Sequence, residues 1–233
     1  MAQTSSTNIF SSAFWKSLLG RFGGRRSARD TPILEPGGLA RFINTRAAHV
    51  AQTALYGYLR TRAGTRFPEL FSNDAFVTSI NIAKWHVWLA CVSDLAVCAG
   101  GLVRRRAPTN ARQVGDLMQA VVGLVLQEAG TPVEAGTEFD AHAQRVRARV
   151  ALCDWDMGTE GEAAFSQSPS ALVQWAPIVD ELKALDEEIV RNSVRFRWLE
   201  VRKDLERLLH AEALIASSGQ MPDDRSPRPV GRI

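Results

Sequence analysis

The chain has 233 residues, of which 45% are hydrophobic and 23% are charged. This composition is ordinary for a globular protein and suffices for one well-packed domain with tails. The formal net charge is only +3, but residues 1–29 carry five Lys and Arg residues and no acid, so the rest of the chain is mildly acidic. A mildly acidic body does not fit a nucleic-acid-binding surface, and we expect no nucleic-acid partner.

Residues 1–37 are expected to form a basic amphipathic arm followed by a Gly-rich linker. Aromatic and aliphatic side chains recur at helical spacing on one face of residues 9–22, and cations occupy the other face. This pattern suits an anionic membrane surface, although a flexible tail or a transit peptide has a similar composition. The predicted membrane contacts are Phe10, Phe14, Trp15, Lys16, Leu18 and Arg21.

Residues 38–216 are expected to form an all-α domain, an irregular bundle of about five helices. No alternating run that would indicate a β-strand is evident. We expect helices over residues 38–63, 74–103, 110–130 and 134–153, and a last one that starts near Ser170. Side-chain oxygens suit the helix starts at Asn73 or Asp74, at Thr109 or Asn110, and at Thr137.

Pro177 is expected to kink the last helix, which then runs without Gly or Pro from Ile178 to Ala216. Its predicted apolar side comprises Leu182, Leu185, Ile189, Val194, Leu199, Leu205 and Leu209. Residues 217–233 contain three prolines and are expected to be disordered.

Residues 75–103 are apolar nearly all round and carry only two formal charges, Lys84 and Asp94. Such a helix belongs in a protein core or in a bilayer. An acid near the middle of a span costs roughly 2.5–3.5 kcal/mol, which favours a core helix over a membrane span. A buried Asp94 then needs a cation, and Arg46 and Arg60 are available.

The chain offers little evidence of catalysis. The Gly-x-Ser-x-Gly elbow of acyl hydrolases is absent. Ser93, His86 and Asp94 share a broad helical stripe and are weak catalytic candidates. However, His86 and Ser93 are about 10 Å apart along a helix, so a histidine from another helix would have to act as the base.

Metal and phosphate motifs are also missing, and we expect no metal and no cofactor. Glu138 with His142, and Glu206 with His210, are four residues apart, but we expect them to be solvated charge pairs. The three cysteines form no paired motif, which is typical of a protein from a reducing compartment such as the cytoplasm.

Residues 45–97 contain four distinctive motifs: LYGYL at residues 55–59, TR-x-GTR at 61–66, a Phe-rich turn at 67–71 and SINIAKW at 79–85. In these motifs the chain resembles a family of small alphaproteobacterial helical proteins. The resemblance implies a shared fold. Members are often called esterases, which would imply hydrolysis of acyl esters, but the family supplies no catalytic residues to carry over.

Tyr56, Arg62, Arg66 and Lys84 crowd the junction between the first two predicted helices. They could converge on an anionic ligand or tie the connecting loop to the bundle. Our leading hypothesis is a non-enzymatic interaction or assembly factor that binds a protein partner in the cytoplasm, beside the inner membrane. The alternative is a small hydrolase.

Overall fold

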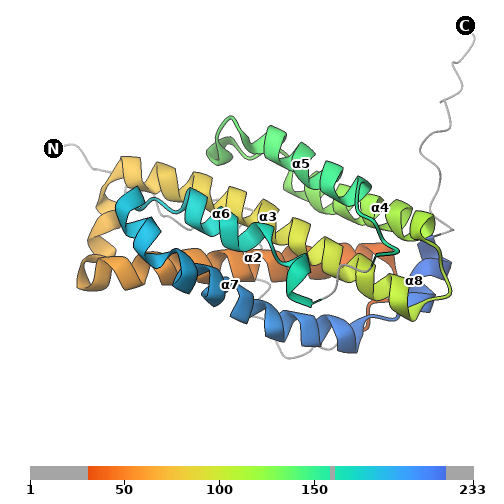
Figure 1. Cartoon of the computed structure of the whole chain (residues 1–233). Helices are drawn as coiled ribbons and strands as arrows, with labels where there is room; N and C mark the ends of the chain where they lie inside the picture. Colours follow the sequence, from red (N-terminus) through yellow and green to blue (C-terminus); the bar gives the residue numbers. More distant parts are fainter. Residues whose placement is uncertain (1–30, 158–160, 219–233) are drawn as a thin grey trace, which may run out of the picture.

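The computed structural model describes residues 31–157 and 161–218, so the predicted membrane contacts of residues 10–21 and the tail 219–233 lie outside the described part. Within it the chain forms seven α-helices and no β-strand, which confirms the all-α class (Figure 1). The helices are α2 (Pro36–Ala63), α3 (Asp74–Arg106), α4 (Ala111–Ala129), α5 (Phe139–Ala151), α6 (Gln167–Trp175), α7 (Asp180–Leu208) and α8 (Ala211–Ser218).

Helix α3 lies at the centre of the bundle and contacts α2, α4, α5, α6 and α8. Its length and composition would also allow it to cross a membrane, but 94% of its most apolar window is buried inside the protein. The other helices therefore cover the apolar surface of α3, as predicted for a core helix. Trp85 and Trp88 are both buried in this core, and their rings meet edge to face.

Two of the predicted helix starts are capped by asparagine. The Asn73 side chain accepts a hydrogen bond from the amide of Phe76 at 3.1 Å, and Asn110 forms a reciprocal capping box with Gln113. The prediction at Thr137 is wrong. α5 begins at Phe139, so Glu138 and not Thr137 occupies the N-cap position, and its side chain makes no capping hydrogen bond. Gly136, with φ of +79°, separates α5 from a 3₁₀ turn at Val133–Ala135.

The break at Pro177 is confirmed, since α6 ends at Trp175 and α7 begins at Asp180. The prediction of a continuous helix to Ala216 is wrong, because α7 ends at Leu208. There Leu209 forms a parallel bridge with Ile33: the Ile33 amide donates to Leu208 at 2.8 Å, and the His210 amide donates to Ile33 at 3.1 Å. Ile33 is buried, so the packed body begins before residue 38.

The predicted apolar side of the last helix is also wrong, because it merged two opposite faces of α7. The face toward the bundle consists of Val190, Val194, Trp198, Val201, Leu205 and Leu208, all buried. Leu182, Leu185, Ile189 and Leu199 are exposed on the other side.

Candidate functional site

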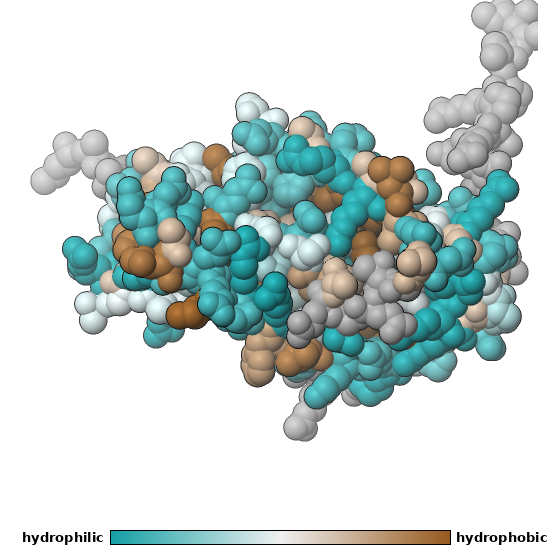
Figure 2. All heavy atoms as spheres, in the orientation of Figure 1, coloured by the Kyte–Doolittle hydropathy of each residue, from teal (hydrophilic) through white to brown (hydrophobic). Residues whose placement is uncertain are grey.

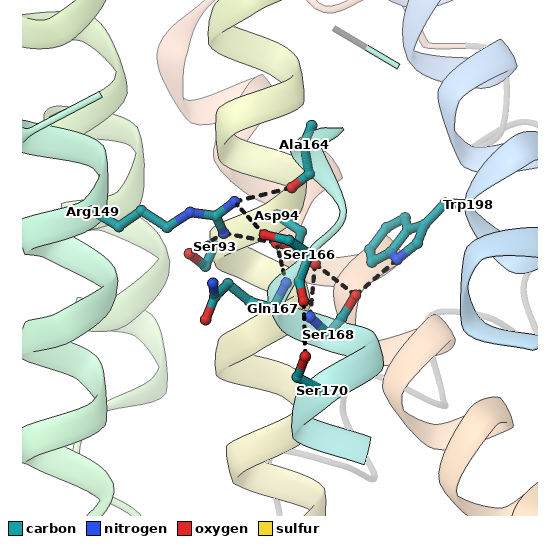
Figure 3. Close-up of polar contacts among 9 residues, drawn as sticks. All are labelled: Ser93, Asp94, Arg149, Ala164, Ser166, Gln167, Ser168, Ser170 and Trp198. Carbon is teal, nitrogen blue, oxygen red and sulfur yellow. Dashed lines mark hydrogen bonds and ion pairs between the residues drawn. The ribbon is translucent and has the colours of Figure 1, made fainter. Parts of the chain in front are cut away.

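Asp94 is completely buried near the middle of α3 and accepts four hydrogen bonds (Figure 3). Its Oδ1 accepts from Arg149 Nη1 at 2.7 Å and from the Gln167 amide at 3.1 Å. Its Oδ2 accepts from the amide and from the hydroxyl of Ser168, both at 2.7 Å. The carboxylate therefore joins α3 to α5 and to the start of α6.

Asp94 takes the place of a local cap for α6. Ser166, at the N-cap position, makes no capping hydrogen bond, and the first amides of the helix instead reach the Asp94 carboxylate. A negative charge is favourable at a helix N-terminus. Burial raises the pKa of Asp94, and the Ser168 amide and the Arg149 charge oppose that rise.

The other hydrogen bonds around Asp94 also link separate segments of the bundle. The Ser168 hydroxyl accepts from Trp198 Nε1 at 3.0 Å, which brings in α7 (Figure 3). Arg149 also donates to Ser93 Oγ at 2.9 Å and to the Ala164 carbonyl at 3.0 Å. The cation that meets Asp94 is thus Arg149, and the expected partner Arg46 instead bonds Asp204 at 2.6 Å.

His86 belongs to a different cluster. Its Nδ1 lies 2.9 Å from His142 Nδ1 on α5, and its ring stacks on Trp175 with centroids 3.6 Å apart. Its Nε2 is buried and makes no hydrogen bond of normal geometry within the described residues. The prediction that Glu138 and His142 form a solvated pair is therefore wrong for His142, which is half-buried against His86.

Burial favours the neutral form of both imidazoles. Burial lowers the pKa of His86, with Glu138 and the Ala135 backbone opposing the shift. Burial also lowers the pKa of His142 to about 4, and His86 and Arg145 add to that effect. The pair packs α5 and α6 onto α3.

The three weak catalytic candidates are not brought together as a hydrolytic centre. Ser93 is 3% exposed and its hydroxyl accepts from Arg149, whereas His86 contacts His142 and Trp175. In the part of the chain that the structure describes, no group of three or more His, Cys, Asp or Glu residues could hold a metal ion.

The four candidate binding residues do not converge on one site, because their side chains have different surroundings. Arg62 donates through Nε and Nη2 to Asp186 on α7, and this contact lowers the pKa of Asp186. Lys84 is buried and donates to Asn81 at 3.0 Å; burial lowers its pKa to about 8. Tyr56 stacks on Phe71, and Arg66 is exposed in a 3₁₀ turn. These contacts favour a structural tie over one anionic pocket.

Exposed apolar side chains gather on the outer face of α7, a stripe turned away from the bundle. Figure 2 shows hydrophobic side chains along the edge of the molecule where α7 runs. The apolar members are Leu182 (36% exposed), Leu185 (76%), Ile189 (73%), Phe196 (74%) and Leu199 (44%). Asn192, also exposed, fills the gap in the series.

These six residues, which we call the outer face of α7, follow a heptad. Their steps of three and four residues are those of the a and d positions of a coiled coil. A single exposed Leu needs no explanation, but a row of five large apolar side chains along one helix is typical of an interaction surface. It is the candidate functional site.

Comparisons of the chain with protein-family models, with curated proteins and with solved structures found no match.

Sequence reasoning missed three elements of this arrangement: the Arg149 contact, the His86–His142 pair and the outer face of α7. The first two depend on packing between distant segments and leave no local pattern. The outer face had a signal, since the 3-4 spacing from Leu182 to Leu199 is separate from the one that runs from Val190 to Leu208.

Proposed function

We propose that this chain is a helical interaction protein that binds a protein partner through the outer face of α7. The observation that carries the proposal is the row of five exposed apolar side chains opposite the buried face of the same helix. A second helix that covers the row removes this apolar surface from water. The burial stabilises the contact by about 25 cal/mol per Å² of apolar surface.

The polar core supports binding over the hydrolase alternative. A nucleophile has to reach its substrate and contact a base. Ser93 is buried and bonded to Arg149, and Asp94 is occupied by donors from α5 and α6. We therefore place no acyl-ester chemistry in this network.

We further propose that the protein works in the cytoplasm, at the inner membrane. The support is the charge of the chain before the packed body, where Lys16 and Arg21 are followed by Arg25, Arg26 and Arg29 without an acid. Each such cation contributes about 1 kcal/mol of attraction near an anionic surface.

The proposal is tested by photo-cross-linking in the native cell with p-benzoylphenylalanine in place of Ile189. We expect a discrete cross-linked product. The matched control places the same group at Leu152, which is 85% exposed and lies outside α7, and should give none. Equal results at the two positions would contradict the proposal.

A further inference from the structure

We propose that the occupant of the outer face of α7 is a second copy of this chain, whose α7 lies antiparallel to the first. The inference rests on the proposed function, because it names the partner for the same surface. Three observations carry it: the arrangement of the apolar side chains, the segregation of charge along the helix, and the position of α7 at the edge of the bundle.

The apolar residues form complete layers when α7 meets its own copy head to tail. The a positions are Leu182, Ile189 and Phe196, and the d positions are Leu185, Asn192 and Leu199. In an antiparallel pair, a residues of one helix lie beside d residues of the other. Leu182 then meets Leu199 of the second copy, Leu185 meets Phe196, and Ile189 meets Asn192, and the two-fold axis repeats each layer.

Asn192 has a defined place in this arrangement. Both copies of its side chain lie near the two-fold axis. Asn192 Oδ1 accepts from Arg195 Nη1 of its own chain at 3.0 Å, and its second lone pair can accept from the side-chain amide nitrogen of the other copy. A single polar residue at such a position fixes the register of a helix pair at some cost in stability. A register shifted by one heptad would place Asn192 beside Leu182 or Phe196 in place of Ile189, and would lose the apolar layers at the ends of the row.

The charges beside the apolar row favour this orientation. The g positions are Glu181, Glu188, Arg195 and Arg202, so acids occupy the first half of the helix and arginines the second half. An antiparallel pair places Glu181 beside Arg202 of the second copy and Glu188 beside Arg195, twice each. A parallel pair would form one such contact, Arg195 beside Glu200, and would place Arg202 beside Arg207.

The surface is free of other described elements. α7 packs on α2 and α6 through its opposite face. Glu181, Glu188 and Arg195 are exposed and Arg202 is half-buried. Asp186, on the other edge of the row, is engaged by Arg62 of its own chain and needs no partner charge.

The length of the row limits the affinity. From Leu182 to Leu199 a helix rises about 26 Å, so the contact is smaller than the roughly 1,600 Å² of a standard stable interface. We therefore expect a dimer with a dissociation constant on the order of micromolar. It dissociates on dilution.

The first experiment is sedimentation equilibrium of the 233-residue chain from about 1 to 200 µM. We expect a monomer–dimer equilibrium that Ile189→Glu weakens at least about tenfold, because the two copies of the new charge would be buried close to one another near the two-fold axis. Leu152→Glu, at an equally exposed position outside α7, should leave the equilibrium unchanged. A chain that is monomeric at 200 µM, or a dimer that Ile189→Glu leaves intact, overturns the inference.

The second experiment tests the orientation by charge reversal. One variant carries Glu181→Arg and Glu188→Arg, which makes all four g positions cationic; the other carries Arg195→Glu and Arg202→Glu, which makes them anionic. Each alone should be monomeric, and an equal mixture should form a heterodimer at low salt. A mixture that stays monomeric, or variants that dimerise like the original chain, overturn the antiparallel pairing. Circular dichroism verifies that both variants remain helical.

Cross-linking at position 189 separates the two proposals. A cross-link to a different protein, with a monomeric pure chain, removes the second copy and leaves the interaction function. A cross-link between two copies, with a concentration-dependent dimer, supports both. If position 189 gives no cross-link and the pure chain forms no dimer, both proposals are overturned.

Discussion

Arg149 and Asp94 form an ion pair in which one partner is fully buried and the other reaches the surface. Arg149 Nη1 lies 2.7 Å from Asp94 Oδ1, with the Arg149 side chain 24% exposed and that of Asp94 not exposed at all. The pair lies on α3 between α5, which carries Arg149, and the start of α6, whose amides also reach Asp94. Its removal should affect the whole bundle rather than one helix end.

Replacement of Arg149 by Ala is expected to lower the free energy of unfolding by about 3 kcal/mol, because it leaves a buried carboxylate without its cation. Urea denaturation followed by circular dichroism measures this. Asp116→Ala is the control: it breaks an exposed pair with Arg112 at 3.9 Å and should cost less than about 0.5 kcal/mol. Similar losses in the two variants would contradict the structural role of the Asp94 network.

Gly100 is predicted to be intolerant of even one methyl group. A Cβ at this position would overlap the buried ring of Trp155 and lie 2.6 Å from its Cη2. Gly100→Ala should therefore destabilise the protein by about 1–3 kcal/mol through overpacking. Gly123→Ala, in α4 and 3.8 Å from the end of Arg147, should instead stabilise the helix by about 0.5–1 kcal/mol. Equal effects would rule out the close approach at Gly100.

The His86–His142 pair predicts a loss of stability in mild acid. The unfolded chain binds a proton at each imidazole near pH 6.5, whereas the folded protein resists protonation of His142 down to a pKa of about 4. Stability from this pair is therefore present above pH 6.5 and falls as the pH drops toward 4, by up to about 3 kcal/mol.

The measurement is the free energy of unfolding between pH 4 and pH 7.5 for the original chain and for His142→Gln. The variant should show a shallower fall, since only His86 still resists protonation. His210→Gln, at an exposed position, should keep the original slope. Parallel curves for all three proteins would exclude the histidine pair as the cause.

The basic arm is predicted to hold the protein on anionic membranes. In vesicle flotation we expect the 233-residue chain to float with vesicles that contain about 30% phosphatidylserine, and binding to weaken as salt is raised. Deletion of residues 1–29 should remove this binding. If both forms float equally, the arm is not the membrane contact.

The sequence predicted the class of fold and its centre because those depend on local patterns. The apolar run 75–103 had to be covered, and the other helical segments carried apolar faces that could cover it. Asn73 and Asn110 marked helix starts because their side-chain oxygens satisfy free amides within three residues. Pro177 marked a break for a local reason as well.

The remaining errors come from contacts between distant segments. The sequence predicted that a buried Asp94 needs a cation. That the cation is Arg149 and not Arg46 depends on how α5 packs against α3. The end of α7 at Leu208 has no Gly or Pro to mark it. The two faces of α7 were merged because both repeat at helical spacing, and only the packed bundle shows which one is covered.

The bridge between Ile33 and Leu209 has a consequence for how the protein is made. Ile33 is among the first residues of the packed body to leave the ribosome, and Leu209 is among the last. The backbone of Ile33 can form its hydrogen bonds to Leu208 and His210 only after nearly the whole packed body has been synthesised. This corner therefore assembles only after Leu209 has been made, and a nascent chain stalled before Leu209 would expose Ile33 to chaperones.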